Sequence, residues 1–92
     1  MADLLHEYTT LVGGTDEKAY VAQAWGHQRA DGMWEGWFVF VPVEGGQARR
    51  TERETSQPNF EALAYWAGGI QPVYLEGALQ RSTPLHLGWS AA

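Results

Sequence analysis

Residues 34–43 constrain the fold of this chain more than any other stretch, because aromatic and β-branched side chains are concentrated there between two turn sequences. Such residues favour β-strands. Side chains alternate between the two faces of a strand, and here both faces are apolar: one carries Trp34, Phe38 and Phe40, the other Trp37, Val39, Val41 and Val43. A strand of this kind must be covered on both sides. We therefore predict that residues 34–43 form the central strand of a small sheet.

Two turn sequences place a neighbouring strand on each side of the central one. Asp31-Gly32 favours a two-residue type I′ turn, because this turn needs positive φ at both central positions; it would join residues 18–29 to the central strand. Residues 44–47 form a second turn and lead into residues 48–55, whose charged and threonine side chains suit a partly solvated edge strand. The predicted sheet is a three-stranded antiparallel meander.

One main helix is predicted after the sheet. Residues 56–59 are typical of a helix start, with Ser56 or Asn59 available as the cap, and apolar residues follow at helical spacing until Gly68-Gly69. Residues 70–75 are predicted to be extended, which would allow a fourth strand, and residues 76–81 are predicted to add a short second helix.

The domain organisation follows from these elements. A chain of 92 residues has room for one modest core. We predict a single α+β domain over residues 1–92, with residues 18–81 as the core and the main helix packed on one face of the sheet. Residues 1–17 are expected to form a short helix or an ordered arm, and residues 82–92 a tail.

A candidate binding face follows from the expected strand register. Two-residue loops would place Trp25 opposite Phe38, and Phe38 opposite Arg53. The helix would then cover the face that carries Tyr20, Ala22, Ala24, Trp37, Val39, Val41, Val43 and Ala48. The opposite face mixes aromatic rings with guanidinium groups, and we predict a binding site there that consists of Trp25, Arg29, Trp34, Phe38, Phe40, Arg49, Thr51 and Arg53. A slip of one residue would exchange the two faces of a strand.

Something should cover this aromatic and arginine face, because monomers rarely expose an apolar patch larger than a few hundred Å². The N-terminal arm or the tail with Leu85, Leu87 and Trp89 could fold over it, with Arg53 stacked on Phe38. A partner protein or a second copy of the chain is another option. A nucleic acid or a small ligand is the third.

Catalytic chemistry finds little support in the sequence. Cysteine is absent, and the three histidines, His6, His27 and His86, do not have metal-ligand spacing. Glu35, Glu52 and Glu54 are more simply strand charges than a glycosidase pair, because a small domain has little room for a deep cleft. We therefore predict no enzyme, no metal and no cofactor. A pocket that uses Tyr65, Tyr74 and Glu76 would be the alternative for a ligand-binding domain.

Charge and hydropathy limit the partners. A formal net charge of −5 disfavours nucleic acid, because neutralising phosphates requires a basic surface. No segment approaches the run of about 18 apolar residues that a membrane helix needs, and the start of the chain does not resemble a signal peptide. We expect a cytoplasmic protein with no membrane partner.

Three segments carry a resemblance. The runs Arg53-Glu54-Thr55-Ser56-Gln57-Pro58, Leu63-Ala64-Tyr65-Trp66-Ala67 and Pro72-Val73-Tyr74-Leu75-Glu76-Gly77-Ala78-Leu79 resemble short bacterial proteins with no assigned activity. A three-stranded meander followed by a helix is also similar in architecture to the sheet-reading DNA-binding domains of certain plant transcription factors and integrase arms. That resemblance implies DNA contacts by Arg29, Trp34, Arg49 and Arg53, although those domains are basic and this chain is acidic.

The function expected from the sequence is therefore a non-enzymatic protein-interaction module that associates with a protein partner or with itself through the aromatic and arginine face. Nucleic-acid binding through the same face is the alternative.

Overall fold

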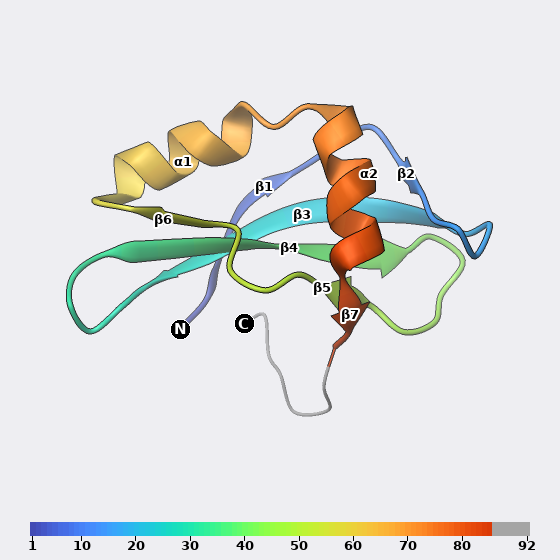
Figure 1. The fold of residues 1–92 in the computed structure, drawn as a ribbon, viewed down its shortest axis with the longest axis horizontal. Helices are drawn as coiled ribbons and strands as arrows, with labels where there is room; N and C mark the ends of the chain where they lie inside the picture. The colour runs from blue at the N-terminus through green and yellow to red at the C-terminus, as the bar shows by residue number, and fades with distance from the viewer. Residues whose placement is uncertain (86–92) are drawn as a thin grey trace.

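The computed structural model describes residues 1–85 and shows an α+β fold in which two helices lie on one side of an antiparallel sheet (Figure 1). The elements in chain order are β1 (Asp3–Glu7), β2 (Val12–Gly13), β3 (Ala19–Gln28), β4 (Trp34–Pro42), β5 (Arg49–Arg50), β6 (Thr55–Gln57), α1 (Phe60–Gly68), α2 (Pro72–Arg81) and β7 (Thr83–Pro84). Across the sheet the strand order is β1-β3-β4-β5-β7, with β2 also paired to β3 and β6 also paired to β4. The predicted α+β class and antiparallel sheet are confirmed, and the predicted meander with one helix is a coarser version of this fold.

The turn between β3 and β4 is longer than predicted. The Arg29 N–H donates to Met33 O at 2.7 Å, and the Gly32 N–H donates to Arg29 O at 3.0 Å. Gly32 has a φ of 89°, whereas Asp31 is not among the residues with positive φ. These features define a three-residue loop, Ala30 to Gly32, with glycine in its left-handed position, which is the next most common hairpin connection after the two-residue turn.

The longer loop changes the register by one residue. Trp25 lies opposite Trp37, and Ala24 lies opposite Phe38. The predicted pairing of Trp25 with Phe38 is therefore wrong, because the turn holds one residue more than a type I′ turn would. A shift of one residue moves all the side chains of one strand to the opposite face of the sheet. The side chains of β3 therefore lie on the predicted faces, whereas those of β4 lie on the faces opposite to the predicted ones.

The helices cover the face that carries Phe38 and Phe40. Both rings are fully buried, as are Ala22 and Ala24 beside them on β3. The Phe38 ring stacks on Trp66 of α1, with 5.2 Å between the ring centroids. The main core is therefore the layer between the sheet and the two helices.

A pair of glycines lets α1 approach the sheet closely. Gly26 of β3 lies opposite Gly36 of β4. A Cβ atom on Gly36 would lie only 2.8 Å from the Trp66 ring and 2.9 Å from the Leu63 side chain, and one on Gly26 would lie 2.7 Å from Leu63. The pair thus forms a notch in which Leu63 is seated, and this close packing requires glycine at both positions.

The predicted edge strand over residues 48–55 is divided. Arg50 pairs with Val39 in β5, whereas Thr55 pairs with Gly36 in β6. Between these two pairs the chain advances five residues, from 50 to 55, while β4 opposite advances only three, from 39 to 36. Two extra residues therefore bulge out between β5 and β6. The predicted pairing of Arg53 with Phe38 is wrong for this reason. The buried Thr51 takes that place, and its Oγ1 accepts a hydrogen bond of 3.0 Å from the Phe38 N–H.

The chain before β3 forms strands at one border of the sheet. β1 pairs with β3 and has a register shift between Leu4 and His6, and β2 pairs with β3 further along. Of the two predicted options for residues 1–17, a helix is wrong and an ordered arm is correct. Residues 3–7 and 12–13 are extended because their backbone pairs with β3, and the local spacing of apolar residues does not reveal this pairing.

The segment after β6 folds into two helices. Asn59 caps α1, and its side chain accepts a 2.8 Å hydrogen bond from the Ala62 N–H. The expected helix over residues 60–67 is confirmed. The expectation that residues 70–75 are extended is wrong, because α2 begins at Pro72. Proline is favoured at the first helical position, where its missing N–H is not needed, and the cap residue Gln71 before it has extended backbone angles.

A partly buried carboxylate connects α2 to the bulge between β5 and β6. Glu54 Oε1 accepts hydrogen bonds from the Tyr74 hydroxyl and from the Arg81 guanidinium, each 2.7 Å long. The Glu54 side chain is only 9 % exposed. The hydrogen bond to Glu54 is the main cause that raises the pKa of Tyr74 above its ordinary value. Within residues 1–85, no helix is both long enough and apolar enough to cross a membrane.

Candidate binding face

The eight predicted site residues do not share one face. Trp25, Arg29 and Arg53 lie on the face of the sheet opposite the helices, since Arg29 and Arg53 both reach Glu35 there. The other five lie on the helix side or within its packing: Trp34, Phe38, Phe40, Arg49 and Thr51. Their predicted grouping is wrong because the register of β4 differs by one residue.

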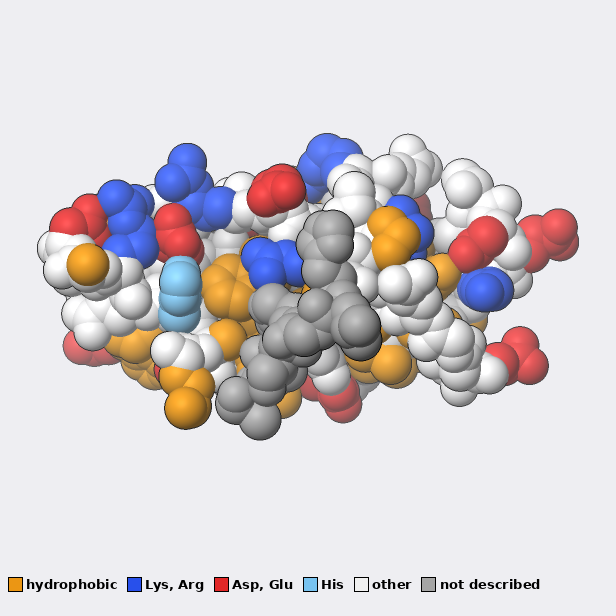
Figure 2. All heavy atoms as spheres, turned by 90° about the horizontal axis from the view of Figure 1, so that it is seen from below, with side chains coloured by type: hydrophobic (Ala, Val, Ile, Leu, Met, Phe, Trp, Pro, Cys, Tyr) orange, Lys and Arg blue, Asp and Glu red, His pale blue; other side chains and the backbone are white. Residues whose placement is uncertain are grey.

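The face opposite the helices carries its own small aromatic cluster, which we call the tryptophan face. Trp25, Trp37 and Val39 are buried there, and Ala2 and Leu85 pack against them. The view of this side shows hydrophobic, basic and acidic side chains next to a histidine (Figure 2). Neither helix contributes to this cluster. Of the three tail residues predicted to cover the aromatic and arginine face, Leu85 packs against this cluster, and Leu87 and Trp89 lie outside the described residues.

A polar network lies at one end of the tryptophan face. His27 and Glu35 are cross-strand partners, and His27 Nε2 is 2.8 Å from Glu35 Oε1. The guanidinium groups of Arg53 and Arg29 lie 3.6 Å and 4.0 Å from Glu35 Oε2. The hydrogen bond to His27, followed by these positive charges, holds the pKa of Glu35 below its ordinary value. The carboxylate is therefore charged and already engaged at neutral pH.

Trp37 is enclosed by cationic and aromatic neighbours. The Arg50 guanidinium lies over the Trp37 ring, 4.8 Å from its centroid, in a cation–π contact. The His27 ring meets the same indole edge-on, with 5.3 Å between centroids. Burial lowers the pKa of Arg50 from its usual value. The tryptophan face thus combines a planar apolar surface with partly desolvated positive charge.

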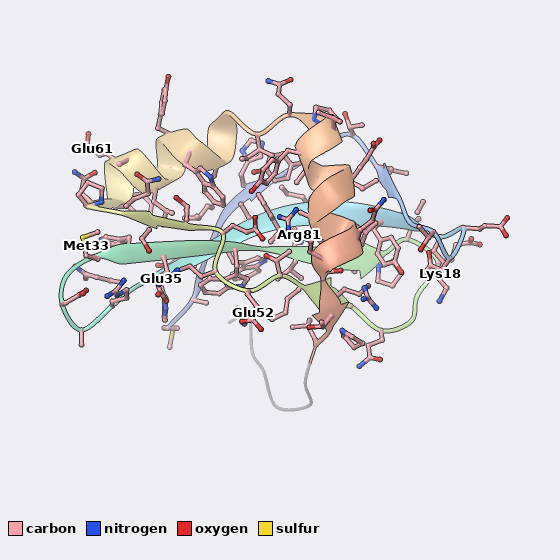
Figure 3. The ribbon with its side chains drawn as sticks, viewed as in Figure 1. Lys18, Met33, Glu35, Glu52, Glu61 and Arg81 are labelled. Atoms are coloured by element: carbon pink, nitrogen blue, oxygen red, sulfur yellow. The ribbon has the colours of Figure 1, made fainter. Side chains whose placement is uncertain are left out.

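A cavity of about 400 Å³ opens on this face. It is lined by Met1, Ala2, His27, Glu35, Trp37, Arg50, Glu52 and Arg53. Glu35 and Glu52 both lie below β4, on the side away from α1 (Figure 3). The Trp37 Nε1 atom is buried and has no hydrogen-bond partner within residues 1–85. The cavity therefore brings together side chains of both charges beside the Trp37 ring.

The other candidates from the sequence are scattered. The His6 ring lies against the Tyr8 ring at a tilt, with 4.6 Å between ring centroids, and His86 lies outside the described residues. Within residues 1–85, no group of three or more potential ligands is placed to hold a metal ion. Tyr65 is 86 % exposed and Tyr74 is bound to Glu54, so these two do not converge on a pocket.

Comparison with known proteins gives no guidance to function, because no family model, no curated protein and no solved structure matches this chain.

The residues missed by sequence reasoning are Trp37, which was assigned to the helix face, and Arg50. Two signals in the sequence could have found them. The first is that one register places His27 opposite Glu35, which are complementary side chains for a cross-strand pair. The second is that the same register places Gly26 opposite Gly36.

Proposed function

We propose that this chain is a non-enzymatic protein-interaction module and that its partner on the tryptophan face is a second copy of the chain. The observation that carries the proposal is the cluster of Trp25, Trp37 and Val39 on a sheet face to which neither helix contributes, bordered by arginines. Tryptophan and arginine are the residue types most enriched at energetically important contacts between proteins.

The charges of the face favour a copy of itself as the partner. In a two-fold interface the same surface is used on both sides, so it must be complementary to itself. Arg53 and Glu52 are sequence neighbours that line the same cavity, and the Arg53 side chain is 59 % exposed. When two such faces meet around a two-fold axis, the arginine of one copy can approach the glutamate of the other. A partner surface of one sign of charge would be repelled by either Arg53 or Glu52.

An exposed valine provides the test. Val41 lies on the same side of β4 as Trp37 and is 38 % exposed, so Val41→Arg adds charge to the face without emptying the core. Val73→Arg is the matched control, because Val73 is 74 % exposed on α2. Sedimentation equilibrium should show a concentration-dependent dimer for the native chain. We expect Val41→Arg to raise the dissociation constant by about tenfold or more, which is about 1.4 kcal/mol, and Val73→Arg to leave it unchanged.

Two results would contradict the proposal. One is a monomer at every concentration reached. The other is equal weakening by Val41→Arg and Val73→Arg, since that would place the contact elsewhere or make it a nonspecific effect of charge.

Nucleic-acid binding is the second candidate, and the observation in its favour is that Arg29, Arg50 and Arg53 share the tryptophan face. Arg49 does not join them, because its guanidinium is bound to Ser82 on the helix side. Titration with single-stranded and duplex oligonucleotides at two salt concentrations tests this idea. Phosphate contacts should strengthen at low salt, so absence of binding there would exclude it.

A further inference from the structure

A second cavity lies on the helix side of the sheet and has a volume of about 180 Å³. Its lining comes from the turn between β2 and β3, from β3, from β5 and from α2. Lys18, which follows that turn, lies at the end of the long strands away from Glu35 (Figure 3). This cavity therefore shares no lining residue with the one beside Trp37.

Asp16 brings a fixed negative charge to the second cavity. Its Oδ1 accepts a hydrogen bond of 3.0 Å from the Lys18 backbone N–H, and its Oδ2 accepts one of 2.7 Å from the Tyr20 hydroxyl. The bond from Tyr20 is the main cause that holds the pKa of Asp16 below its ordinary value, so the carboxylate is charged at neutral pH. The backbone also sets its position, because Glu17 beside it has a φ of 64°, which is uncommon for a residue other than glycine.

Arg49 brings a fixed positive charge to the same cavity. Its Nε donates to Ser82 Oγ at 2.9 Å, and its Nη2 donates to Ser82 O. Within residues 1–85, its Nη1 makes no hydrogen bond. A guanidinium has five N–H donors, so the two bonds to Ser82 orient the group and leave other donors for a ligand.

The two opposite charges are held apart. Within residues 1–85, Asp16 and Arg49 form no ion pair with each other, although they line one small cavity. Each is kept in place by its own hydrogen bonds, Asp16 by the turn and Tyr20, and Arg49 by Ser82. Polar groups that are already fixed in their binding geometry lose little freedom when a ligand binds. The cavity is therefore preorganised for a ligand that carries both charges.

Charge and size select among ligands. An anion would be repelled by Asp16 and a cation by Arg49, whereas a zwitterion places each of its charges next to the opposite one. The volume of about 180 Å³ is below the roughly 300–1,000 Å³ of sites for drug-sized ligands, so only a small molecule fits. Free α-amino acids meet both conditions, because their ammonium and carboxylate are bonded to the same carbon. In a peptide these two groups are at opposite ends of the chain.

We propose that this cavity binds a free α-amino acid with a small side chain, its carboxylate on the Arg49 guanidinium and its ammonium on the Asp16 carboxylate. The Tyr20 hydroxyl donates its proton to Asp16 and retains lone pairs that can accept a second bond from the ammonium. Leu79, which is 5 % exposed, provides an apolar wall. This site does not depend on the interaction module, because it lies on the other side of the sheet and needs only one copy of the chain.

Glycine and two analogues of the same size provide the test. Each is titrated at constant ionic strength into the full chain labelled with ¹⁵N, and the backbone amide signals of Gly14 and Gln80, which line the cavity, are followed. Glycolate replaces the ammonium by a neutral hydroxyl, and glycinamide replaces the carboxylate by a neutral amide. We expect both signals to shift and saturate with glycine. Each analogue should bind about tenfold or more weakly, because it loses one charge-assisted interaction.

Two aspartate variants locate the negative charge. Asp16→Asn should weaken glycine binding by about tenfold or more. Asp31→Asn is the matched control, because Asp31 Oδ1 also accepts a 3.0 Å bond from the backbone N–H two residues later, that of Met33, but Asp31 does not line the cavity. The control should bind glycine as the native chain does. Both aspartates are exposed, and asparagine retains an acceptor oxygen, so both variants should keep the native pattern of amide signals.

Several outcomes would overturn the site. These are the absence of a saturating shift with glycine, equal affinity for glycolate or glycinamide, native affinity in Asp16→Asn, or equal weakening in Asp31→Asn. Failure of the interaction module is a separate result. Val41→Arg reports on association, and it should bind glycine as the native chain does because Val41 does not line this cavity.

Discussion

Replacement of Gly36 by alanine tests the placement of the helices on the sheet. The added Cβ would lie 2.8 Å from the Trp66 ring, 2.9 Å from Leu63 and 3.1 Å from Thr55, where ordinary contacts begin at 3.4 Å. The Trp66 ring would have to retreat by about 0.6 Å, the difference between 3.4 and 2.8 Å, within a packed core. Overpacking of this kind costs about 1–3 kcal/mol. Alanine recovers about 0.5–1 kcal/mol of backbone entropy relative to glycine in a strand.

We therefore expect Gly36→Ala to lower the free energy of unfolding by about 1–2 kcal/mol, which corresponds to a fall in Tm of about 4–8 °C for each kcal/mol in a domain of this size. Gly77→Ala is the matched control. Gly77 lies inside α2, and a Cβ there would meet only the Arg81 side chain at 3.6 Å. The same chemical change should stabilise the chain by about 0.5–1 kcal/mol, because glycine is a poor helix former.

Urea unfolding followed by tryptophan fluorescence measures both variants, with an unchanged slope against urea as the sign that only stability has changed. The reasoning fails if Gly36→Ala is neutral or stabilising, as Gly77→Ala is expected to be. Such a result would mean that Leu63 and Trp66 do not sit on the glycine notch, and that α1 covers the other face of the sheet.

Two further predictions concern carboxylates. Glu54→Gln should lower the free energy of unfolding by about 1–3 kcal/mol, because Glu54 accepts hydrogen bonds from both Tyr74 and Arg81; a double-mutant cycle with Tyr74→Phe should show coupling, and purely additive effects would contradict the contact. The depressed pKa of Glu35 means that the unfolded state takes up the proton first as the pH falls. Stability should therefore be lost as the pH falls from about 5 towards 3, below the ordinary glutamate pKa. The urea midpoint should depend less on pH in Glu35→Gln than in the control variant Glu61→Gln. Identical pH profiles for the two variants would refute the role of Glu35.

Sequence reasoning succeeded where a signal is local. The start of α1 is set by Asn59, whose side chain caps the first turn, and its end is set by Gly69. The central strand was predictable from the density of β-branched and aromatic residues in 34–43. Each of these features depends on residues within one turn or one strand, so the surrounding fold does not overrule them.

Sequence reasoning failed where pairing between distant segments decides the structure. Asp31-Gly32 is compatible with a two-residue or a three-residue loop, and only the three-residue loop seats Leu63 against both Gly26 and Gly36. That single residue determined the composition of the candidate site, because it placed Trp37 instead of Phe38 on the side of the sheet away from the helices. β1 was missed for a related reason, since its partner β3 lies more than ten residues away along the chain.

The interruption between β5 and β6 has a consequence for how copies of the chain can meet. The borders of the sheet consist of short or bulged strands: β6 and β7 on one side, and β1, with its shift at Leu5, together with β2 on the other. Such borders are poor templates for further backbone pairing. Growth of the sheet into fibres by pairing of strands at its borders is thereby hindered.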